Sequence, residues 1–190
     1  DTLYAFDSNG GKIILIDTET GIGNQVENLN YDIVAGLAFD SNSGILYGSD
    51  TATNFLLSID VDSGETSIIK SLGFDSVKDL AHDPISNVVY GVDNLSDALI
   101  QIDAESGKGV FIGRIGFDNV SGIAFDPNQN TLYGSDLSTN QLLLIDTLTG
   151  IGTNVGDIGF EAVEGLAFDP NSNVLYGWNT YPDQRLLQID

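Results

Sequence analysis

The sequence contains no cysteine and no methionine, and it has only one histidine and one tryptophan. Without cysteine there can be no cysteine nucleophile, and the redox compartment cannot be inferred from disulfides. No serine lies in a Gly-x-Ser-x-Gly elbow, and no glycine-rich phosphate loop precedes a helix. The commonest signatures of hydrolases and nucleotide-binding proteins are therefore missing.

Basic residues are also scarce. Six Lys and Arg stand against 28 Asp and Glu, which gives a net charge of −22. A field of this sign repels phosphate backbones and anionic membrane surfaces, so we predict no nucleic-acid partner. No apolar run approaches the length that crosses a bilayer, so we also predict no membrane insertion. Such acidity favours solubility, high-salt surroundings or loosely held divalent cations.

The chain repeats itself every 43 residues. The motif Leu-Tyr-(Gly/Ala) begins at Leu3, Leu46, Leu132 and Leu175, and Val89 fills the remaining position. Ile-Asp pairs recur at the same interval, ending at Asp17, Asp60, Asp103 and Asp146, and only the last copy drifts, by one residue, to Asp190. A period of this length is typical of solenoids and propellers, in which one unit cannot bury its own apolar face.

Each unit contains four short segments of β type. In the copy from Val120 to Phe160 these are 120–126, 131–135, 141–146 and 153–160, separated by turns rich in Asp, Asn, Pro and Gly. No segment places apolar residues at helical spacing over ten residues, so we expect almost no helix. Four strands per unit predict an all-β protein, a β-propeller of four-stranded antiparallel blades. The first segment, with its Gly and Ala residues, is expected nearest the axis, where blades crowd.

The two ends of the chain determine how the ring closes. We expect a single domain over residues 1–190, with a partial blade at 1–33, complete blades at 34–76, 77–119 and 120–162, and a partial blade at 163–190. The first blade lacks its inner strand and the last lacks its outer strand, and exposed edges of this kind invite strand addition. We favour an incomplete ring of about five blades. The alternatives are a slice of a larger propeller and a subunit whose ends are completed by neighbouring chains.

The repeat has the pattern GLAFDPNxNxLYGSD followed by LLxIDxxTG, and it resembles the propellers of the YWTD, NHL and YVTN type. Leu-Tyr-Gly-Ser-Asp lies where the YWTD signature would fall, and the resemblance covers essentially the whole chain. It implies the propeller architecture. For function it implies a range, because such propellers serve as receptors, scaffolds, lectin-like binders and a few enzymes.

Positions at which the copies disagree are the candidate binding residues, because the scaffold makes the same demand on every blade. At the start of the inner segments the copies differ at Ala35, Lys78, Ser121 and Glu164, and Asp79 replaces a glycine. We predict that these five residues line the mouth of the central channel, together with Tyr31, Asp75, Asp118 and Glu161 in the preceding connections. Variation of solvent-facing residues without function is the alternative.

The last unit departs most from the others. Residues 177–185 contain the only tryptophan, Trp178, with Tyr181 and Arg185 nearby. Aromatic and arginine side chains in one place are typical of interface anchors, and they also suit sugar stacking. The alternative is that Trp178, in the slot of Ser49 and Ser135, covers the bare flank of a terminal blade.

Aspartates that recur in every blade are predicted to cap turns rather than to do chemistry. The series that ends the first segment is Asp40, Asp83, Asp126 and Asp169. Residues 17–21 and 60–64 superficially resemble a hard-cation loop, but neither continues to the bidentate Glu of an EF-hand. We therefore predict hairpin turns, no metal site and no cofactor, with weakly bound calcium as the alternative.

The only histidine, His82, holds the slot of Phe39, Phe125 and Phe168. We expect it to pack or cap as a substituted aromatic, and we assign no catalytic residue. An enzyme on this scaffold would need unlike residues from different blades converging at the axis, usually around a metal.

These observations predict a non-enzymatic, secreted or cell-surface propeller that acts as a binding or structural module for a protein or glycan partner. The first alternative is a self-assembling filament or surface-layer subunit whose incomplete blades are completed by copies of itself. The second is a lactonase-like propeller enzyme. The chain opens at Asp1 in mid-blade without an initiator Met, which we interpret as the mature part of a secreted or envelope protein. Sequons at Asn94 and Asn119 would matter only in a glycosylating host.

Overall fold

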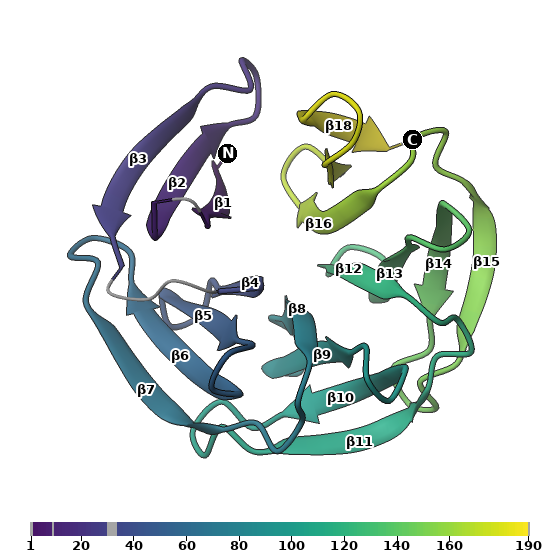
Figure 1. Ribbon diagram of the computed structural model, residues 1–190, viewed down its shortest axis with the longest axis horizontal. Coiled ribbons are helices and arrows are strands. Elements are labelled where there is room, and N and C mark those ends of the chain that lie inside the picture. Colours follow the sequence, from purple (N-terminus) through teal and green to yellow (C-terminus); the bar gives the residue numbers. More distant parts are fainter. Residues whose placement is uncertain (1, 9, 30–33, 190) are drawn as a thin grey trace.

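The computed structural model describes residues 2–8, 10–29 and 34–189, which form 18 strands and no helix. The strands make five sheets arranged around a central hole (Figure 1). Since these residues form no helix, no helical membrane span is found among them. The protein is an all-β propeller of five blades, which confirms the predicted fold class.

The blades follow one another along the chain, and each is an antiparallel sheet. Blade 1 contains β1 (Thr2–Asp7), β2 (Lys12–Asp17) and β3 (Gly23–Asn28). Blade 2 contains β4 (Gly36–Asp40), β5 (Ile45–Asp50), β6 (Phe55–Asp60) and β7 (Thr66–Ser71). Blade 3 contains β8 (Val77–Asp83), β9 (Val88–Asp93), β10 (Ala98–Ile102) and β11 (Gly109–Arg114). Blade 4 contains β12 (Val120–Asp126), β13 (Thr131–Asp136), β14 (Gln141–Ile145) and β15 (Gly152–Asp157), and blade 5 contains β16 (Val163–Asp169), β17 (Val174–Asn179) and β18 (Arg185–Ile189).

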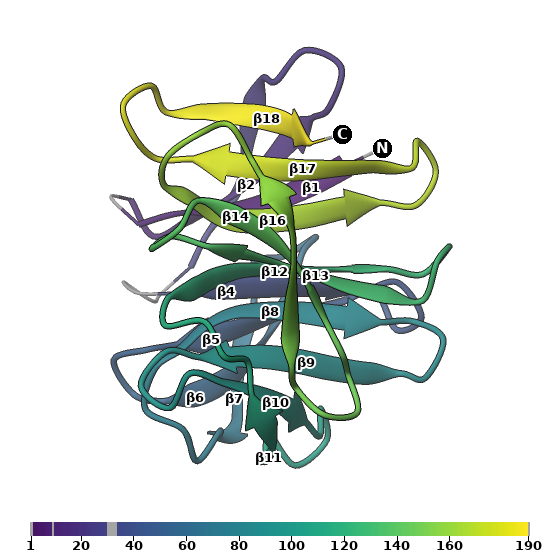
Figure 2. The same ribbon diagram turned by 90° about the vertical axis from the view of Figure 1, so that its right-hand side faces the viewer.

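The inner strands β4, β8, β12 and β16 border the hole and run along its axis, as the two views in Figures 1 and 2 show together. Small residues let neighbouring blades approach closely there. A Cβ atom on Gly36 would lie 2.4 Å from the Cα atom of Asp79 in the next blade, so a larger residue would displace backbone. The expectation that the Gly-bearing segment is innermost is confirmed.

Aspartate side chains close the turns, as predicted. The Oδ1 atom of Asp126 accepts a hydrogen bond of 2.7 Å from the backbone N–H of Asn128. The same hydrogen bond, from the backbone N–H two residues later to the aspartate Oδ1, occurs at Asp40, Asp83 and Asp169. It also occurs in the exposed turns after the third strands, at Asp17, Asp60, Asp103 and Asp146. Because the bonds pair backbone donors that leave the strand ladders, they fix each hairpin locally.

Apolar side chains fill the seams between neighbouring blades. Separate hydrophobic clusters lie between blades 1 and 2, 2 and 3, 3 and 4, and 4 and 5. In the seam between blades 3 and 4, for example, one cluster contains Leu99, Ile123 and Leu143, all of them buried. Each blade therefore depends on a neighbour to cover its flank, as expected of a repeat protein.

The terminal blades are incomplete, as the strand count predicted. Blades 1 and 5 have three strands each, and the middle blades have four. The first strand, β1, occupies the repeat position of the second strands β5, β9 and β13, so blade 1 has no inner strand within the described ranges. Blade 5 ends with β18, which is a third strand, and so has no outer strand there. We call the interface between blades 5 and 1 the open seam, because no hydrophobic cluster of the described residues bridges it.

Candidate functional site

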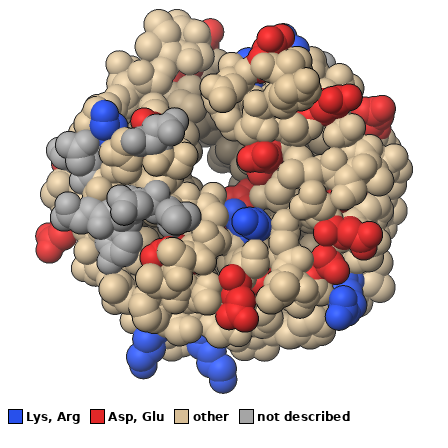
Figure 3. All heavy atoms as spheres, in the orientation of Figure 1, with Lys and Arg blue, Asp and Glu red and all other residues tan. Residues whose placement is uncertain are grey.

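One cavity brings the predicted channel-mouth residues together. It has a volume of about 760 Å³ and lies where the channel meets the open seam. It is lined by all five candidates, Ala35, Lys78, Asp79, Ser121 and Glu164. They become neighbours because equivalent repeat positions lie at the same level of adjacent inner strands. Figure 3 shows basic and acidic side chains at the rim of the central hole.

The predicted connection residues do not belong to this cavity. Asp75, Asp118 and Glu161 are absent from its lining. The carboxylate of Asp75 instead accepts a hydrogen bond of 3.2 Å from Asn54 within its own blade. These residues lie in the crossings from an outer strand to the next inner strand, before the chain reaches the axis. Tyr31, the fourth of them, lies outside the described residues.

The cavity continues outward along the open seam, and its lining there is mostly apolar. Blade 1 contributes Leu3, Ile14 and Ile16, and blade 5 contributes Tyr176, Trp178 and Leu186. The cavity therefore has a charged end at the channel and an apolar part between the blades. Such a shape suits a ligand with apolar side chains along the seam and a polar group at the axis.

Trp178 occupies a slot whose counterparts are covered by the next blade. Ser49 and Ser135 in that slot are 0% and 1% exposed, whereas Trp178 is 40% exposed. The hydroxyl of Ser49 accepts a hydrogen bond from the backbone N–H of Gly36 and donates one to the carbonyl of Val77 in the next blade, both at 3.0 Å. Trp178 therefore marks the flank of blade 5 that faces the open seam.

Asp79 differs from its four companions because it is buried and its carboxylate is already engaged. Oδ2 accepts a hydrogen bond of 2.8 Å from the backbone N–H of Ile123 in blade 4, and Oδ1 accepts one of 2.9 Å from its own neighbour Leu80. The backbone N–H groups of Leu37 and Leu166 also act on it. The side chain thus meets backbone donors of blades 2, 3, 4 and 5 at the axis, a role that its departure from glycine does not by itself indicate.

Three of the other mouth residues are available to a ligand, and the fourth, Ser121, is buried. Ala35, Lys78 and Glu164 are exposed. Glu164 Oε1 accepts a hydrogen bond of 3.2 Å from the hydroxyl of Thr180, which orients the carboxylate without burying it. The hydroxyl of Ser121 is buried and has no hydrogen-bond partner among the described residues. A buried hydroxyl without a partner costs free energy, so Ser121 is a polar group that the mouth leaves unsatisfied.

The aromatic and arginine candidates of the last unit do not form one cluster. Trp178 lines the cavity, but Tyr181 and Arg185 do not. The guanidinium of Arg185 lies 4.7 Å from the ring centroid of Phe160, a cation–π contact on the outer part of the blade. Tyr181 is exposed in the turn between β17 and β18. Trp178 pairs with Leu186 and Asn179 pairs with Arg185, so Trp178 and Arg185 lie on opposite faces of the blade.

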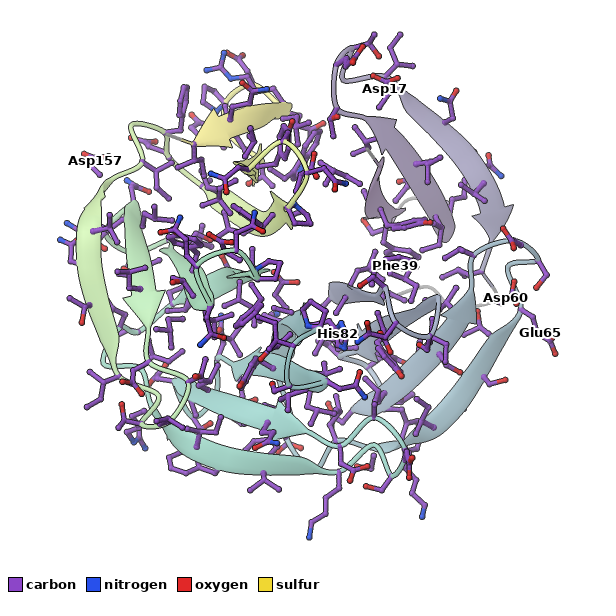
Figure 4. All side chains as sticks on the ribbon, turned by 180° about the vertical axis from the view of Figure 1, so that it is seen from behind. Asp17, Phe39, Asp60, Glu65, His82 and Asp157 are labelled. Atoms are coloured by element: carbon purple, nitrogen blue, oxygen red, sulfur yellow. The ribbon has the colours of Figure 1, made fainter. Side chains whose placement is uncertain are left out.

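The opposite end of the channel is surrounded by several aromatic side chains, which were not predicted to form a site. Phe39, Phe125 and Phe168 line a recess of about 480 Å³ together with His82 and Tyr4. Figure 4, seen from behind, shows Phe39 and His82 beside the hole. His82 therefore takes an aromatic position as expected, and its Nε2 lies 3.5 Å from Asp40 Oδ1 and 3.4 Å from Asn87 Oδ1.

The loops that resemble cation sites are hairpin turns. Asp60 Oδ1 accepts hydrogen bonds from the backbone N–H groups of Asp62 and Ser63 and from the Ser63 hydroxyl. Asp17 and Asp60 lie at the outer part of their blades, away from the channel (Figure 4). In the part of the chain that the structure describes, no three acidic or histidine side chains gather as metal ligands do.

Two kinds of aspartate have pKa values shifted in opposite directions. The backbone N–H of Ser63, followed by its hydroxyl, lowers the pKa of Asp60 below the usual 3.8, and the equivalent bonds lower the pKa values of Asp17, Asp103 and Asp146. Burial raises the pKa of Asp79 well above 3.8, although the N–H donors around it act to lower it. Stability should therefore depend on pH in two separate ranges.

We expect the free energy of unfolding to be greatest near about pH 4. As the pH rises from there toward the folded pKa of Asp79, stability falls, because the folded state holds that proton more tightly than the unfolded state. Repulsion among the accumulating negative charges acts in the same direction. Below about pH 4 stability falls again, because the turn aspartates bind protons more tightly when unfolded. Urea unfolding across this range measures the profile. Asp79→Asn should reduce only the fall in stability above about pH 4. An unchanged fall in this range would contradict the assignment of that fall to the proton held by Asp79.

Comparisons with solved structures define the class of the fold. The chain is similar to a chain of the nidogen/laminin complex, with a TM-score of 0.74 and 19% identity over 94% of this chain and 69% of that one. A protein of unknown function from Bacteroides thetaiotaomicron gives a TM-score of 0.70 at 12% identity, over 99% of this chain and 66% of its own. Virginiamycin B lyase from Staphylococcus aureus gives 0.60 at 17% identity, over 98% and 65%.

The chain thus spans about two thirds of the length of these propellers. No protein-family description matches the sequence, and no curated protein sequence matches it. The similarity confirms a β-propeller, and assignment to the YWTD, NHL or YVTN type stays a prediction. The neighbours include a lyase as well as a protein crystallised in a complex, so the fold alone does not separate binding from catalysis.

Proposed function

We propose that this protein is a non-enzymatic, extracellular binding module, and that its ligand occupies the cavity at the channel mouth and the open seam. One observation carries the proposal: five residues that vary between otherwise similar blades line a single cavity with the only tryptophan. A protein partner presenting an extended, largely apolar segment suits the lining best. The nidogen/laminin complex is an example of a similar propeller found with a protein partner.

The charges at the mouth suggest how a ligand would be oriented. Lys78 and Glu164 are exposed on the inner strands of blades 3 and 5, so they offer one charge of each sign across the channel. Asp79 is engaged with backbone donors and supports the mouth rather than contacting the ligand. A glycan stacking on Trp178 is the competing ligand class.

The double substitution Lys78→Glu and Glu164→Lys exchanges the two mouth charges without changing the net charge. It should lower the affinity for the ligand at least about tenfold. The probes are a peptide library displayed on phage and an array of oligosaccharides, each selected on wild-type protein. Trp178 reports binding directly, because it is the only tryptophan and lies in the cavity. If the exchanged variant loses binding only to peptides, the partner is a protein. If it loses binding only to sugars, the partner is a glycan.

A matched control exchanges a pair far from the cavity, Glu65→Lys with Lys70→Glu, both exposed near the outer strand of blade 2. This variant should bind like the wild type. If no selected ligand distinguishes the two exchanged proteins, and none changes the Trp178 fluorescence, the cavity is not the binding site. A turnover activity abolished by the mouth exchange would contradict the non-enzymatic assignment.

Assembly through the terminal blades is the second candidate. The inner edge of β1 and the outer edge of β18 favour it, because neither pairs with another strand in the described ranges. Light scattering across a concentration series would separate this candidate from a monomeric binding module.

A further inference from the structure

The recess at the end of the channel opposite the mouth is built from one position of the repeat. The residue directly before the aspartate that ends each inner strand lines it: Phe39, His82, Phe125 and Phe168. Tyr4 lines it as well, and the volume is about 480 Å³. Each of the four inner strands pairs with the second strand of its own blade, so the repeat itself sets these positions. We call this cavity the aromatic recess (Figure 4).

Tyrosines of the preceding blades hold the phenylalanine rings in place. The ring centroids of Tyr4 and Phe39 lie 5.2 Å apart, and those of Tyr90 and Phe125 lie 6.3 Å apart. The packing does not cover the rings completely, since Phe39 is 40% exposed. Rings that are fixed before a ligand arrives lose little conformational freedom when it binds, which favours affinity.

The rest of the lining is mostly apolar and contains no fixed positive charge. Leu80, Ile123 and Ala124 form part of the channel wall beside the rings. Among the described residues that line the aromatic recess there is no lysine or arginine, and Asp169 is the one carboxylate. Such a lining offers an anion no partner, so it selects against anionic ligands.

Carboxylates lie directly beside the aromatic positions. A buried aspartate follows each of them in the sequence: Asp40, Asp83, Asp126 and Asp169. Although burial disfavours the charged form, the Ser43 hydroxyl and the Asn42 N–H lower the pKa of Asp40 below 3.8, and equivalent bonds lower the pKa of Asp169. The aromatic recess is therefore next to negative charge at neutral pH, and the net charge of −22 strengthens that potential.

An ammonium group that carries methyl groups matches this lining better than other cations do. Aromatic faces attract a cation electrostatically, and methyl groups fit an apolar wall. A quaternary ammonium has no N–H group, so it needs no hydrogen-bond acceptor in the cavity. A metal ion needs several oxygen ligands, and no group of three acidic or histidine side chains suited to a metal is found in the described part of the chain.

We propose that the aromatic recess binds a small organic cation of the quaternary ammonium class, against the rings of Phe39, Phe125 and Phe168. The methyl groups contact the rings and the apolar wall, and the neighbouring carboxylates attract the charge through space. This is a second site, at the end of the channel opposite Lys78 and Glu164, and it does not rest on the ligand proposed for the mouth.

Choline and 3,3-dimethylbutan-1-ol are matched probes, because a carbon atom in the alcohol replaces the quaternary nitrogen of choline. Titration calorimetry on the full chain should show one choline site with a Kd of about a millimolar or below, and binding of the alcohol at least about tenfold weaker. A buffer at about pH 8 keeps the imidazole of His82 in its ordinarily neutral range. About 0.2 M NaCl screens the exposed carboxylates of the surface.

Phe39→Leu removes one aromatic face and retains an apolar side chain. It should weaken choline binding about fivefold to tenfold and change the affinity for the alcohol much less. Phe111→Leu is the matched control, because Phe111 is 52% exposed on β11 and does not line the aromatic recess. It should bind choline like the wild type. Circular dichroism checks that both variants fold, and the comparison of the two probes on the wild type needs no variant.

Equal affinity for choline and the alcohol, or no heat of choline binding to the wild type, would overturn the proposal. Equal weakening by Phe39→Leu and Phe111→Leu would overturn it as well. The exchange at Lys78 and Glu164 should leave choline binding unchanged, and loss of choline binding in that variant would place the cation at the mouth instead. If choline binds as expected while the exchange affects no selected ligand, the aromatic recess stands as a site and the channel-mouth site falls.

Discussion

Replacing Asp79 with alanine will lower the free energy of unfolding by about 2–4 kcal/mol at neutral pH. The side chain accepts the backbone N–H groups of Ile123 and Leu80 at 2.8 and 2.9 Å, and those of Leu37 and Leu166 also act on it. Its removal leaves donors from four blades without that partner at the axis. Water entering the cavity will offset part of the loss, so the cost stays below the full penalty of leaving the donors unpaired. Urea unfolding followed by circular dichroism measures the change.

Lys78→Ala is the matched control, because Lys78 is adjacent in sequence and exposed at the same mouth. It should change stability by no more than about 0.5 kcal/mol. Formate, which carries the same carboxylate group, should restore part of the stability of Asp79→Ala and leave the wild type unchanged. A variant as stable as the wild type would mean that the carboxylate does not hold the blades together.

Gly113→Ala should destabilise the protein by about 2–4 kcal/mol. A Cβ atom at this position would lie 1.9 Å from the carbonyl oxygen of Thr149 in the next blade. Because the obstacle is backbone rather than the end of a flexible side chain, the seam between blades 3 and 4 must shift. That seam holds a large hydrophobic cluster, including Leu99 and Ile115. Thermal and urea unfolding both measure the effect.

Gly156 is the equivalent residue one blade later and provides the control. A Cβ atom there would meet nothing within 4 Å, because its position faces the region beside the incomplete blade 5. Gly156→Ala should therefore leave stability within about 0.5 kcal/mol of the wild type. Similar losses for the two variants would contradict the difference in packing between the third and fourth blades.

The repeat alone was enough to predict the architecture. Four strand segments per unit, with an Asp-capped turn after the first, determine both the blade and the strand count of the incomplete ends. The repeat also predicts that equivalent positions lie at the same level along the channel axis. This brings together the mouth residues Ala35, Lys78, Ser121 and Glu164. What such a pattern specifies is the part of the structure that every copy shares.

The sequence could not reveal features that depend on convergence at the axis. Asp79 is a single departure from glycine, and nothing local indicates that backbone donors of four blades point toward it. The separation of Trp178 from Arg185 depends on the strand register, which pairs Trp178 with Leu186 and leaves Arg185 on the opposite face. The aromatic side chains around Phe39 offer little contrast from which to infer a site, because phenylalanine recurs at this position in blades 2, 4 and 5.

Binding of a ligand in the open seam would also stabilise the folded ring. Among the described residues, the hydrophobic clusters cover one flank of blade 1 and one flank of blade 5. A ligand that binds only when both blades are in place stabilises them together, in proportion to the logarithm of its concentration. The abundance of such a partner would then govern how long the folded ring persists.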